Sequence, residues 1–173
     1  MTLVSCAYDA HAAAILAIFN DAIANSTALY EYKPRTMETM KAWFATKEAN
    51  RFPVIGAVDD RGALMGFASY GNFRAFPANK YTVEHSVYVE KSHRGKGVSL
   101  VLMEAIIQKA RAANLHTLIG GIDATNEVSI AVHKKMGFEH AGTIRHAAFK
   151  FGRWLDLAFY QLILETPLAP VDG

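Results

Sequence analysis

Cysteine is nearly absent from this sequence, because Cys6 is the single cysteine among 173 residues. One thiol cannot form a disulfide within the chain, and a zinc site built from several cysteines is excluded. Since disulfides mark oxidising compartments, we predict a cytoplasmic location. Long hydrophobic runs are absent too: no stretch approaches the roughly 20 apolar residues of a membrane span. Residues 1–14 lack the pattern of a signal peptide, so we expect no membrane partner.

An excess of one charge is also missing. Lys and Arg total 18, Asp and Glu total 16, and the net charge is +2. Proteins that bind nucleic acid through its phosphates usually carry a basic excess or a basic stripe. We therefore expect no nucleic-acid partner.

Apolar residues, by contrast, are plentiful. Hydrophobic residues make up 51% and aromatic residues 11% of the chain, which is enough for a packed core. The length fits one domain, which we place at residues 1–165. Residues 166–173 hold two of the five prolines and are expected to form a C-terminal tail.

Strand-like and helix-like patterns alternate along the chain. We expect helices over residues 12–24, 34–50, 98–114 and 126–136, with Asp9 and Thr36 as caps of the first two. We expect strands over residues 3–7, 54–58, 63–70, 81–90, 117–122, 138–149 and 154–164. Residues 155–164 of the last are apolar on both faces, which predicts a central, doubly covered strand. The order predicts an α/β fold with a mixed sheet and helices on both faces.

The most informative local pattern lies between the strand at 81–90 and the following helix. It reads Arg94-Gly-Lys-Gly-Val-Ser99. Glycines permit a tight turn and a close backbone approach, and the helix start adds partial positive charge. With Arg94 and Lys96, the segment is suited to hold a pyrophosphate. It fits neither the P-loop motif nor the dinucleotide fingerprint, since the required third glycine is missing from the latter. On the loop alone, a solvated basic turn that caps a helix explains it equally well.

A wider run of residues resembles one family. Arg94-x-x-Gly97-x-Ser99 resembles the acetyl-CoA loop of the GCN5-related N-acetyltransferase (GNAT) superfamily. Asn126-Glu-Val-Ser129, followed by His133-Lys-Lys-Met-Gly-Phe138, is similar to a second element of that superfamily, in the expected order and separation.

Other segments resemble one branch, the phosphinothricin and methionine-sulfoximine acetyltransferases. They are residues 19–22, 72–76, 81–89 and 149–156. The resemblance extends to about Leu164. It implies a mostly antiparallel central sheet, acetyl-CoA as co-substrate and a homodimer formed by the apolar C-terminal strands.

The resemblance also implies which residues bind acetyl-CoA. The backbone of the strand segment would contact the pantetheine arm, the glycine loop would bind the pyrophosphate, and one amide and one lysine would bind elsewhere on the molecule. These residues are Val87, Tyr88, Val89, Arg94, Gly95, Lys96, Gly97, Val98, Ser99, Leu100, Asn126 and Lys135. Each has a simpler interpretation: a core strand, a helix cap for Asn126 and a solvated lysine for Lys135.

Glu84 is the predicted catalytic base. It lies opposite the valines of an alternating strand, and the resemblance puts a catalytic glutamate at this position. Partial burial would raise its pKa toward a useful range. Without the resemblance, an exposed surface glutamate would be the simpler interpretation.

Arg74 is the most notable candidate for binding the amine substrate, because its planar fork can hold a carboxylate. Phe73 and Phe76 would wall an apolar slot beside it. The full predicted substrate set is Phe73, Arg74, Ala75, Phe76, Glu84, His85 and Ser86. His85 shares a face with three valines, so a core histidine with a satisfied partner is its more frequent role.

Two positions depart from the family pattern. Ser99 replaces a usual Gly or Ala, and His133 replaces a Tyr proposed as general acid in many members. The histidines show no ligand spacing on a shared helix, so we predict no metal.

These observations predict an N-acetyltransferase that transfers acetyl from acetyl-CoA to the α-amine of a small amino acid analogue. Methionine sulfoximine, methionine sulfone and phosphinothricin are the expected substrates, acetylated by direct attack in a ternary complex. One alternative keeps the chemistry and changes the amine to a polyamine, an aminoglycoside or a protein N-terminus. Another is an acetyl-CoA sensor without turnover, since cofactor binding does not prove catalysis.

Overall fold

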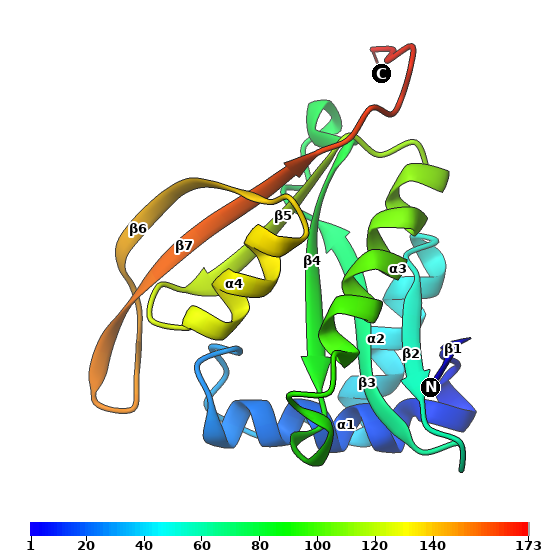
Figure 1. The fold of residues 1–173 in the computed structure, drawn as a ribbon, viewed down its shortest axis with the longest axis vertical. Helices are drawn as coiled ribbons and strands as arrows, with labels where there is room; N and C mark the ends of the chain where they lie inside the picture. Colours follow the sequence, from blue (N-terminus) through cyan, green and yellow to red (C-terminus); the bar gives the residue numbers. More distant parts are fainter. Residues whose placement is uncertain (173) are drawn as a thin grey trace. The chain divides into compact units, whose positions relative to one another are not determined.

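The computed structural model describes residues 1–172 as a mixed α/β fold (Figure 1). The strands are β1 (Thr2–Ser5), β2 (Val54–Val58), β3 (Leu64–Asn72), β4 (Thr82–Val89), β5 (Thr117–Asp123), β6 (Glu139–Lys150) and β7 (Arg153–Ile163). The helices are α1 (Tyr8–Asn25), α2 (Met37–Ala49), α3 (Val98–Ala112) and α4 (Glu127–Lys135), with short 3-10 turns η1 (Pro77–Asn79) and η2 (Lys91–His93). The sheet order is β1-β2-β3-β4-β5-β7-β6, and the β4–β5 pair is parallel. A mixed, mostly antiparallel sheet is therefore confirmed.

The chain divides into two compact units, which share the strands β3 and β4 and the helix α3. Unit 1 comprises residues 1–69 and 86–106, and unit 2 comprises residues 70–85 and the chain from residue 107 onward. Each unit is described separately below.

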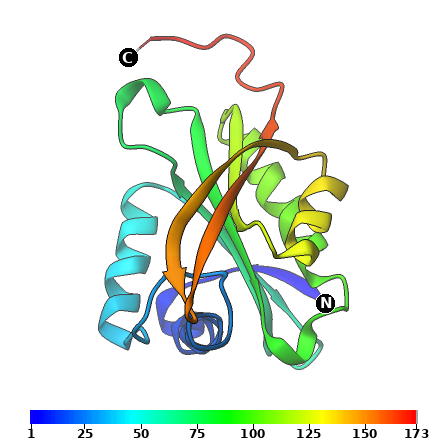
Figure 2. The same cartoon turned by 90° about the vertical axis from the view of Figure 1, so that its left-hand side faces the viewer.

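Unit 1 has a core of aliphatic and aromatic side chains from α1, α2, β2 and β3. Phe19 of α1 makes an edge-on contact with Phe67 of β3, with ring centroids 5.0 Å apart. Figure 2 shows α1 and α2 next to each other beside β2 and β3. The fully or nearly fully buried members of this core are Ala12, Ile15, Ile18, Phe19, Met40, Phe44, Val54 and Phe67.

Helices cover both faces of the sheet within unit 1, as predicted. Successive residues of a strand point to opposite faces. Phe67 packs against α1, whereas a Cβ at the neighbouring Gly66 would meet the Leu102 side chain of α3 at 3.2 Å. The same Cβ would lie 2.6 Å from the Tyr88 carbonyl oxygen, so glycine permits the close approach of β4 here.

Unit 2 contains the long hairpin formed by β6 and β7, which curves away from α4 in Figure 1. β7 pairs antiparallel with β5 from Thr117↔Ile163 to Asp123↔Leu157. The parallel ladder between β4 and β5 covers only three residue pairs, from Thr82↔Thr117 to Glu84↔Ile119.

The C-terminal segment is held to unit 2 by hydrogen bonds. Thr166 Oγ1 donates to the carbonyl of Leu115, and the backbone N–H of Val171 donates to the Tyr81 hydroxyl at 3.1 Å. The expected tail therefore follows a defined course over the part of it that the structure describes.

Several local predictions need correction. Asp9 does not cap α1: the helix begins at Tyr8, Ala7 is its N-cap without a side-chain bond, and Asp9 lies in the first turn. The second helix begins at Met37 rather than Pro34, because Thr36 and Thr39 form a capping box there. β7 is an interior strand, as predicted, but residues 155–164 are not fully covered on both faces, since Ile163 is exposed and Leu157 and Phe159 are half-buried.

Candidate functional site

The glycine loop of unit 1 adopts the backbone conformation that its sequence demands. Gly95 and Gly97 have φ angles of +74° and +78°, a region that residues with a Cβ rarely enter. Helix α3 starts at once with Val98, and the carbonyl of Gly97 accepts from the backbone N–H groups of Leu100 and Val101. The first N–H groups of a helix have no partner inside it. The start of α3, including half-buried Ser99, is therefore suited to an anionic ligand.

Two acidic residues, Glu90 and Asp21, hold the glycine loop and the turn before it in place through hydrogen bonds. The Glu90 carboxylate accepts from the Ser92 hydroxyl, the Ser92 N–H (2.8 Å) and His93 Nδ1 (2.9 Å). These bonds lower the pKa of Glu90 to about 2. Arg94 donates to the Asp21 carboxylate of α1 (2.9 Å) and to the Val89 carbonyl (3.3 Å), which holds its half-exposed guanidinium in place. Lys96 is exposed.

The end of β4 in unit 1 carries Val87, Tyr88 and Val89, all half-buried. The Tyr88 ring packs against Phe19 and Phe67, with centroids 5.2 Å and 5.4 Å away, so its side chain belongs to the core. Because the ladder to β5 ends at Glu84, the backbone groups of β4 beyond that residue take no part in it.

Glu84 in unit 2 combines exposure with crowding. Its side chain is exposed to solvent, yet surrounding protein atoms remove part of the water around its carboxyl, and this desolvation raises its pKa. The neighbouring strand makes room for it: a Cβ at Gly121 of β5 would lie 3.0 Å from Glu84 Oε1. The same Cβ would meet Leu157 at 3.3 Å and Phe159 at 3.7 Å. The Glu84 carboxyl and the side chains of Leu157 and Phe159 thus meet over Gly121, which has no side chain of its own.

One predicted substrate residue joins this group. The ring of Phe73 makes an edge-on contact with Phe159, with centroids 6.1 Å apart. Arg74, Ala75 and Phe76 are exposed, and Arg74 has no hydrogen-bond or ion-pair partner among residues 1–172. Phe73 therefore lies on the Glu84 side of the sheet, whereas Phe76 makes no ring contact among residues 1–172.

His85 lies on the opposite face from Glu84 and is 5% exposed. Its Nε2 is 3.0 Å from Nε2 of His133 on α4, and His133 Nδ1 is 2.7 Å from the carbonyl of Ser129. A Cβ at Gly120 would come within 2.7 Å of His133 and 3.0 Å of His85. His85 is therefore a core histidine with a partner at Nε2, but the prediction that it is fully satisfied is wrong, because its buried Nδ1 makes no hydrogen bond among residues 1–172. The structure does not bring its side chain to the Glu84 face.

The histidine pair is neutral, and its protons can be assigned. Burial, and then the charge of His133, lower the pKa of His85 to about 3, and burial lowers that of His133. A carbonyl only accepts, so His133 Nδ1 carries a proton and donates to Ser129. The other nitrogen of His133 then accepts from His85 Nε2. Both ring nitrogens of His133 are therefore engaged.

The remaining predicted residues lie on or beside α4 and β4. Asn126 is the N-cap of α4, where its Oδ1 accepts from the Ser129 N–H at 3.1 Å. Lys135 is exposed in the last turn of that helix, and Ser86 is half-buried on β4.

Sequence reasoning missed three residues that shape the Glu84 face: Gly121, Leu157 and Phe159. The glycine doublet Gly120-Gly121 inside a strand was the available signal, because glycine there often marks a close approach. It also missed the pair formed by Asp123 and Arg153. Within residues 1–172, no group of three or more His, Cys, Asp or Glu side chains could hold a metal ion, and no helix is long and apolar enough to cross a membrane.

A family model described as an acetyltransferase (GNAT) domain matches residues 5–159. The chain belongs to the GNAT acetyltransferase family. It is 45% identical over 157 residues to the L-methionine sulfoximine/L-methionine sulfone acetyltransferase of Pseudomonas aeruginosa, covering 90% of this chain and 91% of that protein.

Solved structures agree with this assignment. A protein from Acinetobacter baylyi ADP1 is 61% identical, with a TM-score of 0.98 over 99% of this chain and 96% of that chain. A GNAT phosphinothricin acetyltransferase from Sinorhizobium meliloti, solved in complex with acetyl-CoA, is 33% identical, with a TM-score of 0.94 over 99% of this chain and 94% of that chain. The GNAT chain described here is thus an N-acetyltransferase.

Proposed function

We propose that this GNAT enzyme transfers acetyl from acetyl-CoA to the α-amine of a small amino acid analogue, namely methionine sulfoximine, methionine sulfone or phosphinothricin. The observation that carries the proposal is the open Glu84 carboxyl, with a raised pKa, beside the apolar side chains of Leu157 and Phe159. The activities named for the relatives from P. aeruginosa and S. meliloti support the choice of substrates.

Glu84 acts as the general base. An ammonium group must lose a proton before its nitrogen can attack the thioester, and a carboxylate with a raised pKa accepts that proton more readily. The proton passes to Glu84 directly or through one water molecule. The neutral amine then attacks in a ternary complex, and acetyl moves from sulfur to nitrogen in one transfer.

Acetyl-CoA is bound by groups from the C-terminal end of β4 and from segments that follow it in the chain. Residues 94–100 bind the pyrophosphate through backbone N–H groups and the Arg94 and Lys96 charges. The β4 backbone at Val87–Val89 receives the pantetheine arm, supported by the early end of the β4–β5 ladder. Asn126 and Lys135 contribute side-chain contacts, for which the Asn126 amide nitrogen remains after Oδ1 has capped α4.

The thiolate leaves without a histidine acid. Both ring nitrogens of His133 are engaged, so it has no proton to donate while the pair with His85 is intact. An ordinary thiol has a pKa near 8.5, which makes its thiolate a fair leaving group at neutral pH.

Arg74 binds the α-carboxylate of the amino acid, supported by its exposed guanidinium without a protein partner. Phe73 and Phe76, with Ala75 between them, shape the apolar side of the slot. Arg74 and the net charge of +2 would not attract a polycationic amine such as a polyamine or an aminoglycoside.

The active form is a homodimer, with the isologous pairing that most dimers use. Exposed aromatic side chains near the turn of the β6–β7 hairpin support this: Phe149, Phe151 and Trp154 are 46%, 58% and 57% exposed. Side chains of this kind are enriched in the cores of protein interfaces.

A thiol-release assay with acetyl-CoA and a panel of amines tests the proposed function. The panel holds methionine sulfoximine, methionine sulfone, phosphinothricin, ordinary amino acids, spermidine, an aminoglycoside and a peptide. We expect turnover with the sulfur and phosphorus analogues. Turnover with spermidine or peptide alone contradicts the substrate class, and binding of acetyl-CoA without turnover of any amine indicates a sensor.

A further inference from the structure

Arg153, at the start of β7, makes an ion pair that sequence reasoning did not predict. Its Nη2 donates to Asp123 Oδ2 at 2.9 Å and to Thr125 Oγ1 at 3.2 Å. The two partners differ greatly in exposure: the Asp123 side chain is 1% exposed and the Arg153 side chain 45%. The buried carboxylate thus fixes one nitrogen of a guanidinium that otherwise faces solvent.

The carboxylate that holds Arg153 lies on the same face of the sheet as Glu84. Directly paired residues of neighbouring strands point to the same side, and the register gives Glu84↔Ile119. Along β5, Ile119, Gly121 and Asp123 share one face, because side chains alternate. Gly121 is the position over which Glu84, Leu157 and Phe159 converge. Asp123 follows two residues later, which corresponds to about 7 Å along a strand.

Most of the Arg153 fork remains available. Nη2 makes both bonds, and Nε and Nη1 have no hydrogen-bond partner among residues 1–172. Asp123 has partners besides arginine, since its Oδ1 accepts from both the N–H and the hydroxyl of Thr125 at 3.0 Å. An arginine that is anchored by one nitrogen and open at the others is preorganised to bind a second oxygen-bearing group.

The Glu84 face therefore has three parts in sequence: a base, an apolar floor formed by Leu157 and Phe159, and an anchored cation. An amino acid placed with its amine at Glu84 and its side chain over the floor would bring the end of that side chain toward Arg153. We propose that Arg153 is a specificity-determining residue that binds the oxygen atoms at the far end of the substrate's side chain. Sulfone, sulfoximine and phosphinate groups all present such oxygens, whereas a thioether does not. This inference rests on the proposed function.

The test compares two amino acids that differ only in those oxygens. For methionine sulfone, KM is measured. For methionine, the inhibition constant is measured from its competition with the acetylation of the sulfone, so that a value is obtained whether or not methionine is itself acetylated. For Arg153→Ala we expect KM for the sulfone to rise about tenfold or more, the loss typical of one charge-assisted hydrogen bond. The methionine constant should change less than about twofold, within the range of ordinary surface substitutions.

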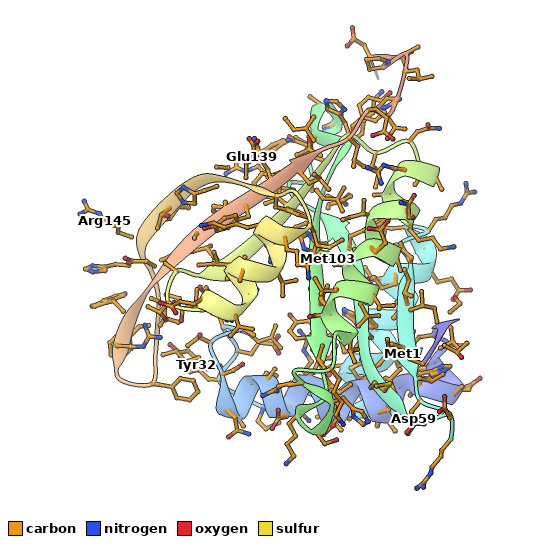
Figure 3. The ribbon with its side chains drawn as sticks, in the orientation of Figure 1. Met1, Tyr32, Asp59, Met103, Glu139 and Arg145 are labelled. Carbon is orange, nitrogen blue, oxygen red and sulfur yellow. The ribbon has the colours of Figure 1, made fainter. Side chains whose placement is uncertain are left out.

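Three further arginine variants serve as controls. Arg145→Ala removes an exposed arginine of β6, which points away from β7 in Figure 3, and should leave both constants unchanged. Arg74→Ala should raise both constants equally, because both compounds have an α-carboxylate. Arg153→Lys keeps the charge and should recover part of the sulfone affinity.

Equal effects of Arg153→Ala on the two compounds, or no effect on either, would overturn the inference and leave Arg153 as a partner of Asp123 alone. Where Arg153→Ala fails to fold, Asp123→Asn/Arg153→Gln removes both charges together and should show the same selective loss. Failure of the proposed function is seen separately, as absent turnover of methionine sulfone by the unaltered enzyme.

Discussion

Glu84 and His85 are consecutive residues of β4 with opposite surroundings. Glu84 is exposed, its pKa is raised, and the apolar side chains beside it leave its carboxyl open. His85 is buried, its pKa is lowered, and it is bonded to a second histidine. The alternation of a strand separates them completely: one face carries the carboxyl proposed as the base, and the other carries groups that hold the sheet and α4 together.

The largest effect expected on the reactive face comes from Glu84→Gln. The amide is nearly isosteric but cannot accept the amine proton, so kcat should fall about 100- to 10,000-fold. The KM for acetyl-CoA should change little, because the co-substrate does not depend on this proton transfer. Steady-state kinetics at neutral pH measure both.

Glu139→Gln is the matched control for that substitution. Glu139 is an exposed glutamate at the start of β6, and its removal should leave kcat unchanged (Figure 3). Unchanged turnover in Glu84→Gln would show that Glu84 is not the base. The two faces of β4 would then differ in burial but not in function.

The two adjacent glycines of β5 give a sharper contrast. In Gly121→Ala the new methyl would press on Glu84 Oε1, the end of a flexible side chain, so the carboxyl should shift and kcat should fall about 10- to 100-fold. In Gly120→Ala the methyl would press on two rigid buried rings, so the free energy of unfolding should drop by about 1–3 kcal/mol.

Urea unfolding and steady-state kinetics on both glycine variants decide the contrast. We expect the larger loss of stability in Gly120→Ala and the larger loss of kcat per folded molecule in Gly121→Ala. The reverse order, or equal losses in both variants, would contradict the assignment of separate roles to the two faces.

The smallest effect expected is a difference in pH dependence between the two faces. The folded pKa of His85 is lowered from 6.5 to about 3, so its contribution to stability is complete above 6.5 and is lost as the pH falls toward 3. The folded pKa of Glu84 is raised, so its contribution is complete below 4.5 and is lost as the pH rises through the folded value.

Unfolding experiments between pH 7 and pH 5 check the histidine part, with a limit of about 1.4 kcal/mol per pH unit for one group. His85→Asn keeps a hydrogen-bond donor for His133 but does not titrate. It should therefore flatten the dependence of the free energy of unfolding on pH. The rate should increase with pH as Glu84 ionises, and Glu84→Gln should remove that dependence. An unchanged slope in His85→Asn would show that His85 does not gain a proton on unfolding and would contradict its lowered pKa.

Much of the fold could be predicted because its signals are local. Gly95 and Gly97 announce left-handed backbone, and Thr36 with Thr39 forms a capping box within four residues. Asp9 misled the prediction of the first helix for the same reason: a capping residue type is only a local signal, and the helix already begins one residue before it, at Tyr8.

The candidate site was predictable only in part, because its contacts join distant residues. Glu84 was predicted as the base from the family resemblance, and strand alternation indicated only which way it faces. Its surroundings were not predicted, since Phe73 meets Phe159 and His85 meets His133 across separations of 86 and 48 positions. No spacing rule relates such positions; they are brought together by the register of β5 with β4 and β7. The pairing of Arg153 with Asp123 could not be predicted either, because the two residues lie 30 positions apart.

The C-terminal segment is hydrogen-bonded to the chain just before each of the two parallel strands, β4 and β5. Thr166 bonds to Leu115 just before β5, and Val171 bonds to Tyr81 just before β4. His116 and Thr117 also donate to the carbonyl of Tyr81. These hydrogen bonds hold β4 and β5 together where both strands begin. The parallel ladder between the two strands ends at the pair Glu84↔Ile119. Replacing Thr166 by valine would remove the bond to Leu115 and loosen the segment that joins the starts of the two strands.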